Sequence, residues 1–166
     1  MRQDSTVTIR PVKRNDARVL RDLIHELAKY ERLEHEAIMT EEDILRDGFG
    51  PRPKFRALIA EAGDQIAGYA LFFEFYSSFQ GRAGLFLEDI FVRPEFRKQG
   101  VGTKLLAEVA KIAWEEDYFC LRWEVLDWNT PAIDFYKKID AEFLDQWKAV
   151  CLIGDALQAM SQKAAK

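Results

Sequence analysis

Hydrophobic residues recur with the period of a strand at the start of the chain and with the period of a helix after it. Thr6 to Arg10 alternate as in a short strand, which Pro11 closes. A helix is expected next, with Asn15 as its cap. Its apolar positions are Val19, Leu20, Leu23, Ile24 and Leu27. The pattern predicts a strand followed by an amphipathic helix.

The next stretch predicts a short helix and a hairpin. Thr40 and Asp43 have the spacing of a variant capping box, for a helix that stops near Gly48. Ala57–Ala62 and Gln65–Tyr76 read as two strands joined by a Gly-Asp turn. We therefore expect two neighbouring antiparallel strands here.

Strands and helices continue to alternate to the end of the chain. The later strands expected are Leu85–Val92, Phe119–Leu126 and Phe143–Ile153, and the later helices are Thr103–Trp114 and Pro131–Lys138. Residues 161–166 are expected to be a frayed tail. This order predicts an α/β (α+β) fold, a mixed sheet with helices on its faces. With 166 residues, one domain over 1–166 is expected.

Charge and composition exclude several classes of partner. The net charge is -4, so a basic surface for nucleic acid is not expected. No apolar run is long enough to span a bilayer, and Met1–Thr8 lacks the apolar core of a signal peptide. Cys120 and Cys151 lack the spacing of a metal site, and we expect both to be buried free thiols in a reducing compartment. We expect a cytoplasmic protein without a metal.

The segment from Leu85 to Thr103 carries the most specific chemistry. A buried strand leads into the loop Arg97–Gly102, and a helix begins after it. Glycines allow a tight turn and close approach to a ligand, and amides at a helix start suit phosphate oxygens. Taken alone, the same string also fits a plain strand-to-helix turn. It lacks the Gly-Lys-Ser/Thr of a P-loop and the spacing of the dinucleotide fingerprint.

This strand and loop, together with Asn129–Tyr136, resemble the Gcn5-related N-acetyltransferase superfamily. Leu23–Glu34, Thr40–Gly50, Leu87–Val92 and Val125–Lys138 resemble its diamine branch, the spermidine/spermine and thialysine N-acetyltransferases. The resemblance implies a three-layer fold with a twisted, mostly antiparallel mixed sheet and helices on both faces. It also implies acetyl-CoA as co-substrate, a small-molecule amine as acceptor, and a homodimer.

The resemblance assigns two catalytic residues. Tyr136 matches the general acid beside the departing sulfur, and Glu88 matches the carboxylate that takes the amine's proton through water. A phenol, with a reference pKa of about 10, is protonated at neutral pH and can hydrogen-bond to a developing thiolate. From the residues alone, the preferred interpretation of Tyr136 is a helix tyrosine packed in the core.

The family's binding positions fall on two groups of residues. Those matching coenzyme contacts are Ile90, Phe91, Val92, Arg97, Lys98, Gln99, Gly100, Val101, Gly102, Thr103, Asn129, Thr130, Pro131 and Ala132. Those matching the substrate side are Tyr30, Glu31, Glu88 and Asp89. Adjacent acids in a strand face opposite ways unless a bulge intervenes. An ion pair of Asp89 with a lysine or arginine is the alternative to substrate binding. From spacing alone, the preferred interpretation of Tyr30 and Glu31 is an exposed helix end.

Two departures from the family pattern affect the interpretation. Polyamine-specific members carry Asp-Pro-Trp where this chain has Ser77–Phe79, which favours thialysine, a lysine-like amine or a short diamine. Asp140 stands where the family often has glycine, and aspartate tolerates the left-handed turn expected there. Two alternatives remain open: another acceptor, such as a protein amine or an antibiotic, and a silent fold that binds acyl-CoA as a sensor or serves as a partner-binding module.

Overall fold

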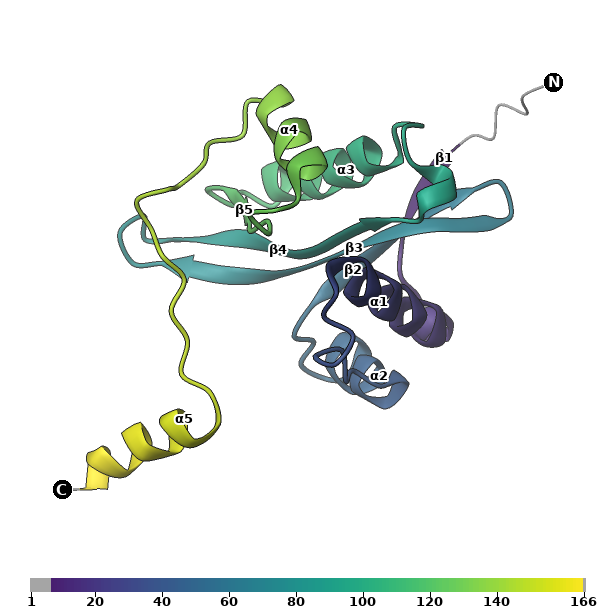
Figure 1. The fold of residues 1–166 in the computed structure, drawn as a ribbon. Coiled ribbons are helices and arrows are strands. Elements are labelled where there is room, and N and C mark those ends of the chain that lie inside the picture. The colour runs from purple at the N-terminus through teal and green to yellow at the C-terminus, as the bar shows by residue number, and fades with distance from the viewer. Residues whose placement is uncertain (1–6, 166) are drawn as a thin grey trace. The chain divides into compact units, whose positions relative to one another are not determined.

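A five-stranded mixed sheet forms the centre of the first part of the chain (Figure 1). The computed structural model describes residues 7–165, which divide after Glu124 into two compact units. The strands are β1 (Val7–Pro11), β2 (Arg56–Ala62), β3 (Gln65–Ser77), β4 (Arg82–Val92) and β5 (Leu121–Trp123). They lie in sequence order. The pairs from β1 to β4 are antiparallel, and β4 pairs with β5 in parallel.

Helices cover both faces of this sheet. Helices α1 (Ala17–Glu31) and α2 (Glu41–Phe49) lie on one face, and α3 (Val101–Glu115) lies on the other (Figure 1). Short 3-10 helices precede α1 (η1, Arg14–Asp16) and α3 (η2, Pro94–Phe96). The core under α1 contains Leu20, Leu23, Ile44, Tyr69, Leu71 and Phe91. The predicted three-layer α/β architecture is confirmed.

The first two helix starts expected from the sequence have different outcomes. Thr40 accepts a hydrogen bond from the Asp43 amide at 3.2 Å, and the predicted capping box is present. Asn15 does not cap α1, because it lies inside η1 and the helix begins at Ala17. Asp16 explains the shift, since its Oδ2 accepts hydrogen bonds at 2.7 Å from both the Lys13 amide and Arg10.

The second unit contains helices but no strand among its described residues. Its elements are α4 (Thr130–Lys138), α5 (Gly154–Ser161) and η3 (Gln162–Ala165). The strand expected at Phe143–Ile153 is therefore wrong. Its alternating apolar residues favour a strand, but a strand needs a pairing partner, which the second unit does not offer. The side chains of Trp147, Val150 and Ile153 in this stretch are exposed.

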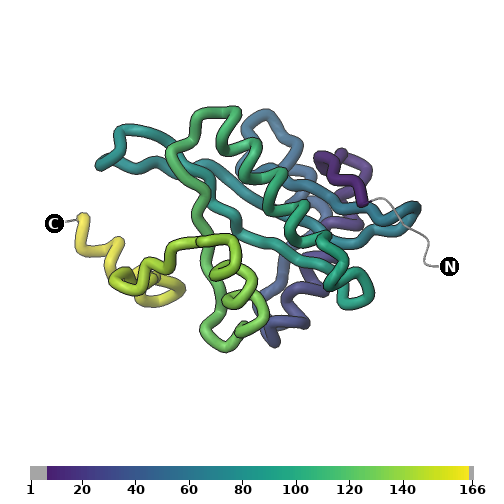
Figure 2. The backbone as a smooth tube through the Cα atoms, turned by 90° about the horizontal axis from the view of Figure 1, so that it is seen from above, coloured from purple at the N-terminus to yellow at the C-terminus, as the bar shows by residue number. Residues whose placement is uncertain are grey.

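The remaining boundaries differ by a few residues. β5 is shorter than the expected Phe119–Leu126, and β4 begins three residues before Leu85. Thr6, the expected start of β1, lies outside the described residues. In the view from above, β3 and β4 run side by side across the first unit with α3 over them (Figure 2). None of the helices within residues 7–165 is long and apolar enough to cross a membrane.

Candidate active site

A β-bulge interrupts the pairing of β3 with β4 at the two adjacent acids. Leu71 of β3 pairs with Asp89. The next residue of β3, Phe72, pairs with Leu87, so Glu88 is the additional residue of the bulge. Paired residues share a face, and successive residues alternate. Asp89 therefore shares with Leu71 the face under α1, while Leu87 lies on the opposite face.

Beyond the bulge, β4 loses its neighbour on one side. β5 pairs with β4 only from Leu85 to Leu87. In the first unit, no described strand continues this parallel ladder along Ile90, Phe91 and Val92. A strand edge left open offers backbone N–H and C=O groups, with which an extended amide-containing ligand can pair.

The loop after β4 forms a turn with two left-handed residues. Lys98 has φ +60° and Gly100 has φ +79°, a conformation that strains lysine but suits glycine. Gly100 is the N-cap of α3, which begins at Val101. A Cβ added at Gly100 would meet nothing within 4 Å. Because first-turn amides have no acceptor within their own helix, this turn fits phosphate oxygens.

The other loop side chains are held away from the turn or are exposed. The Gln99 side-chain amide donates to the Glu95 carbonyl at 2.9 Å. Lys98 and Thr103 are exposed, and a Cβ at Gly102 would lie 3.7 Å from Val92 Cγ2, an ordinary contact. The loop therefore offers a ligand chiefly its backbone.

Arg97 turns its side chain toward α1. Its Nε donates to the Val92 carbonyl at 2.9 Å. The guanidinium carbon lies 4.6 Å from the centre of the Tyr30 ring and 5.8 Å from that of Phe91, both cation–π distances. Arg97 thus joins the end of β4 to the end of α1. A contact of Arg97 with a coenzyme stays a prediction.

Three carboxylates lie beside the bulge, and none of them has a paired cation among the residues that the structure describes. Burial raises the pKa of Asp89 to about 6, the hydrogen bond from Tyr69 opposes this rise, and the charges of Glu88 and Glu31 add to it. Burial also raises the pKa of Glu31, and burial with the charge of Glu124 raises that of Glu88.

No lysine or arginine within residues 7–165 forms an ion pair with any of these three carboxylates. The structural ion pair considered for Asp89 is therefore not found there. Glu31 is also the last residue of α1, where the helix dipole is negative. Burial of like charges is costly, and a bound cation would relieve that cost.

Tyr69 is the partner of Asp89, and it is not among the site residues predicted from the sequence. Its hydroxyl donates to Oδ2 of Asp89 at 3.0 Å. Tyr69 is fully buried, and its ring centre lies 6.4 Å from that of Phe91. Burial, followed by the charge of Asp89, raises the pKa of Tyr69 well above its usual value, so the phenol stays protonated. The sequence feature that could have indicated this pair is a tyrosine and an aspartate in neighbouring apolar strands, since both residue types need a hydrogen-bond partner when buried.

The other predicted site residues belong to the second unit. Asn129 is the N-cap of α4, and its carbonyl accepts from the Ile133 amide at 3.0 Å. Thr130, Pro131 and Ala132 form the first turn of α4, as expected. Tyr136 is buried, with its ring centre 5.5 Å from that of Phe135. The catalytic role of Tyr136 stays a prediction.

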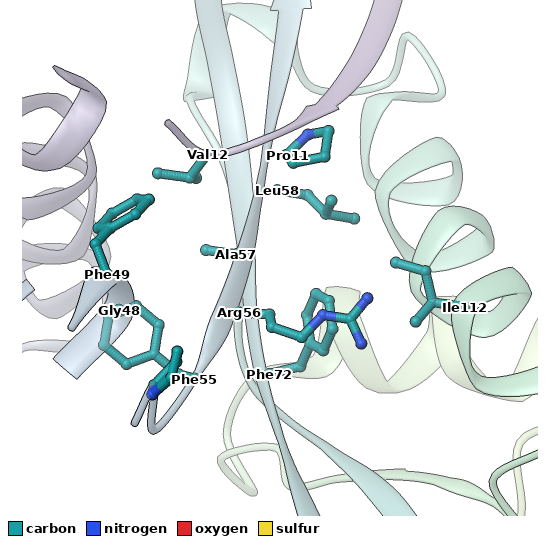
Figure 3. Close-up of a pocket in the computed structure, with 11 residues that line it drawn as sticks. Pro11, Val12, Gly48, Phe49, Phe55, Arg56, Ala57, Leu58, Phe72 and Ile112 are labelled. Carbon is teal, nitrogen blue, oxygen red and sulfur yellow. The ribbon is translucent and has the colours of Figure 1, made fainter. Parts of the chain in front are cut away.

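A cavity of about 220 Å³ lies elsewhere in the first unit (Figure 3). It is lined mainly by apolar side chains, among them Val12, Phe49, Phe55, Leu58 and Ile112. Its one charged side chain, Arg56, forms two hydrogen bonds with Glu116 and lies 5.3 Å from the Phe72 ring centre. None of the predicted site residues lines it, so the candidate chemistry does not depend on this cavity.

Cysteines and metal-ligating residues do not form a further site within residues 7–165. No group of three or more His, Cys, Asp or Glu side chains there could hold a metal ion. Cys120 and Cys151 are free thiols. The expectation that both are buried is wrong, because Cys120 is half-buried and Cys151 is exposed.

Curated proteins of animals and plants are similar to this chain. The thialysine N-epsilon-acetyltransferase of Sus scrofa is 36% identical over 170 residues, which covers 96% of this chain and 99% of the relative. The protein of the same name from Bos taurus is 38% identical over 168 residues, 95% of this chain and 98% of the relative. L-ornithine N5-acetyltransferase of Arabidopsis thaliana is 42% identical over 97 residues, 58% of this chain and 42% of the relative.

Solved structures share the fold at low identity. An integron cassette protein from the mobile metagenome of V. cholerae superposes with a TM-score of 0.79 at 22% identity, covering 94% of this chain and 98% of that one. The model of the acetyltransferase (GNAT) family matches residues 20–140, which include the bulge, the loop and α4. The chain belongs to the acetyltransferase (GNAT) family.

Proposed function

We propose that this protein transfers the acetyl group of acetyl-CoA to a primary amine of a small molecule, of the thialysine, lysine-like or short diamine type. The observation that carries the proposal is the group of unpaired carboxylates at the bulge, Glu31, Glu88 and Asp89. An alkylamine has a reference pKa near 10.4 and arrives as a cation. The names of the animal relatives support the same class of acceptor.

The donor side of the proposal rests on the open edge of β4 and the turn before α3. Acetyl-CoA is the co-substrate of the family and supplies the activated acetyl thioester. We assign its pantetheine amides to the backbone of Ile90–Val92 and its pyrophosphate to the amides of Lys98–Thr103. Asn129 and residues 130–132 of α4 are proposed as further contacts. Binding through backbone groups explains why this role needs the glycine at the turn more than the side chains of Lys98 and Gln99.

Direct transfer requires three tasks of the protein. The cation must be bound and then lose a proton, for which we assign Glu88, since its side chain stays accessible to solvent at the bulge. The neutral amine can then attack the thioester carbonyl, so that the C–N bond forms and the C–S bond breaks. The leaving thiolate takes a proton, for which we assign the phenol of Tyr136, and the proton lost by the acylated nitrogen restores the phenol. Tyr30, Glu31 and Asp89 are assigned to binding the amine.

We also propose an oligomeric state and a cellular location for the protein. A homodimer is proposed because the stretch Phe143–Ile153 has strand-like alternation and exposed apolar side chains, including Val150 at 94% exposure. A second copy could cover such residues. A cytoplasmic location stays a prediction from composition.

The acceptor class is tested with a panel of thialysine, lysine, putrescine and spermidine, assayed with acetyl-CoA by thiol release. We expect thialysine or another short amine to give the highest kcat/KM, and spermidine a lower one, because Ser77–Phe79 lacks the acid of the polyamine-specific members. Coenzyme binding by calorimetry without turnover of any amine would instead identify a silent acyl-CoA-binding module. If only peptide or antibiotic amines were acetylated, the proposed class of small-molecule acceptors would be wrong.

Tyr136→Phe tests the proposed acid. The substitution removes one hydroxyl and keeps the ring, so we expect kcat to fall by about 10²-fold or more, with the Kd of acetyl-CoA nearly unchanged. Tyr118→Phe is the matched control, since that hydroxyl binds Glu74 at 2.9 Å on another part of the first unit. An equal loss of turnover and coenzyme affinity in Tyr136→Phe would make Tyr136 structural.

Glu88→Gln tests the proposed base through the pH profile. The amide cannot accept a proton, so kcat should fall by about 10²-fold near pH 7. The loss should shrink toward pH 9–10, where more of the amine is already neutral, given its reference pKa near 10.4. Glu74→Gln serves as control. A profile that keeps its shape in Glu88→Gln would remove Glu88 from the proton path.

A further inference from the structure

We propose that Tyr69 is a positioning residue for the acceptor amine: its buried hydroxyl fixes the Asp89 carboxylate beside the β4 bulge, with the second oxygen left for the substrate's ammonium group. The inference rests on the proposed function and adds to it a residue that lies under α1, outside the family's motif stretches.

The geometry makes Tyr69 a rigid donor. It pairs across the strands with Phe91, so it stands diagonally opposite Asp89, whose own cross-strand partner is Leu71. Its ring is enclosed by the core under α1 and is 0% exposed. The hydroxyl lies 3.0 Å from Oδ2 of Asp89. A ring held in this way directs its O–H at one oxygen only, so the carboxylate has one orientation.

Within residues 7–165, no cationic side chain acts on Asp89 in competition with this hydrogen bond. The charged and titratable groups that act on Asp89 are Tyr69 from β3, Glu88 from β4 and Glu31 from α1. Both glutamates raise the pKa of Asp89, and only the Tyr69 hydroxyl lowers it. A phenol donates one hydrogen bond to the carboxylate without neutralising its charge. A lysine or arginine at this place would stabilise the anion more strongly, but it would compete with the cationic substrate.

Tyr69 thereby affects the pH range in which the site attracts a cation. Asp89 attracts the ammonium group only when ionised, that is, above its pKa of about 6. Removing the hydroxyl removes the interaction that favours the ionised form, so the pKa of Asp89 rises. The amine stays protonated throughout this range. As the pH is lowered, a variant without the hydroxyl should therefore begin to lose affinity for the cation at a higher pH than the wild type does.

The experiment is a titration of Tyr69→Phe in the full-length protein. The ¹³C resonance of the Asp89 carboxyl group, assigned by its absence in Asp89→Asn, is followed from pH 4.5 to 9. In parallel, the Ki of the trimethylammonium analogue of the best acceptor amine is measured. This analogue keeps the charge but has no nucleophilic lone pair.

We expect the midpoint of Asp89 to rise by about one pH unit, the size expected when a carboxylate loses a hydrogen bond. The Ki of the analogue should then rise roughly threefold at pH 6.5 and be nearly unchanged at pH 8.5. Tyr118→Phe, which deletes the hydroxyl of a more exposed tyrosine–carboxylate pair, should leave both values unchanged.

A double-mutant cycle tests whether Tyr69 acts through Asp89. In the Asp89→Asn background, Tyr69→Phe should have no further effect on the Ki. The proposal is overturned if the midpoint of Asp89 is the same in Tyr69→Phe and wild type, or if Tyr69→Phe weakens the analogue equally at all pH values and in the Asp89→Asn background. The NMR midpoint needs no acceptor, so it separates this inference from the acceptor panel that tests the proposed function.

Discussion

The additional residue in β4 is the constraint on which the rest of the candidate site depends. A regular ladder would put Leu87 and Asp89 on one face, and would make Asp89 a neighbour of the apolar side chains under α3. The bulge at Glu88 switches the alternation, so Asp89 shares a face with Leu71 and meets the hydroxyl of Tyr69. The pairing with β5 also ends at Leu87. The local irregularity thus turns an acid toward α1, beside the point where one edge of β4 becomes open.

The two substrates are proposed to bind at different parts of this region, the amine through charged side chains and the coenzyme through backbone groups. The carboxylates at the bulge lie on the side of α1, and burial raises the pKa of each. An ammonium group binding there lowers the free energy of an otherwise unfavourable arrangement. The loop before α3 offers backbone amides and a left-handed glycine instead. Arg97 links the two, because its side chain contacts both Tyr30 and the end of β4.

The sequence predicted the parts of this fold that depend on local patterns. The capping box at Thr40, the hairpin of β2 and β3, the start of α4 and the left-handed Asp140, at φ +58°, all follow from a few adjacent residues. The strand at Phe143–Ile153 was wrong because pairing depends on a partner, which no alternation of apolar residues supplies. The role of Tyr69 could not be predicted from the sequence for a related reason. Its partner lies 20 residues away, and only the register of β3 on β4 brings the two together.

We propose that the open edge of β4 and the turn before α3 hold the coenzyme through main-chain groups. Amide hydrogen exchange with and without coenzyme A tests this role most directly. Slower exchange is predicted for the amides of Ile90–Val92 and Lys98–Thr103, with no change in the strands around the cavity of Figure 3. Coenzyme that binds measurably but leaves these amides unprotected, or that protects the cavity lining instead, would contradict the account.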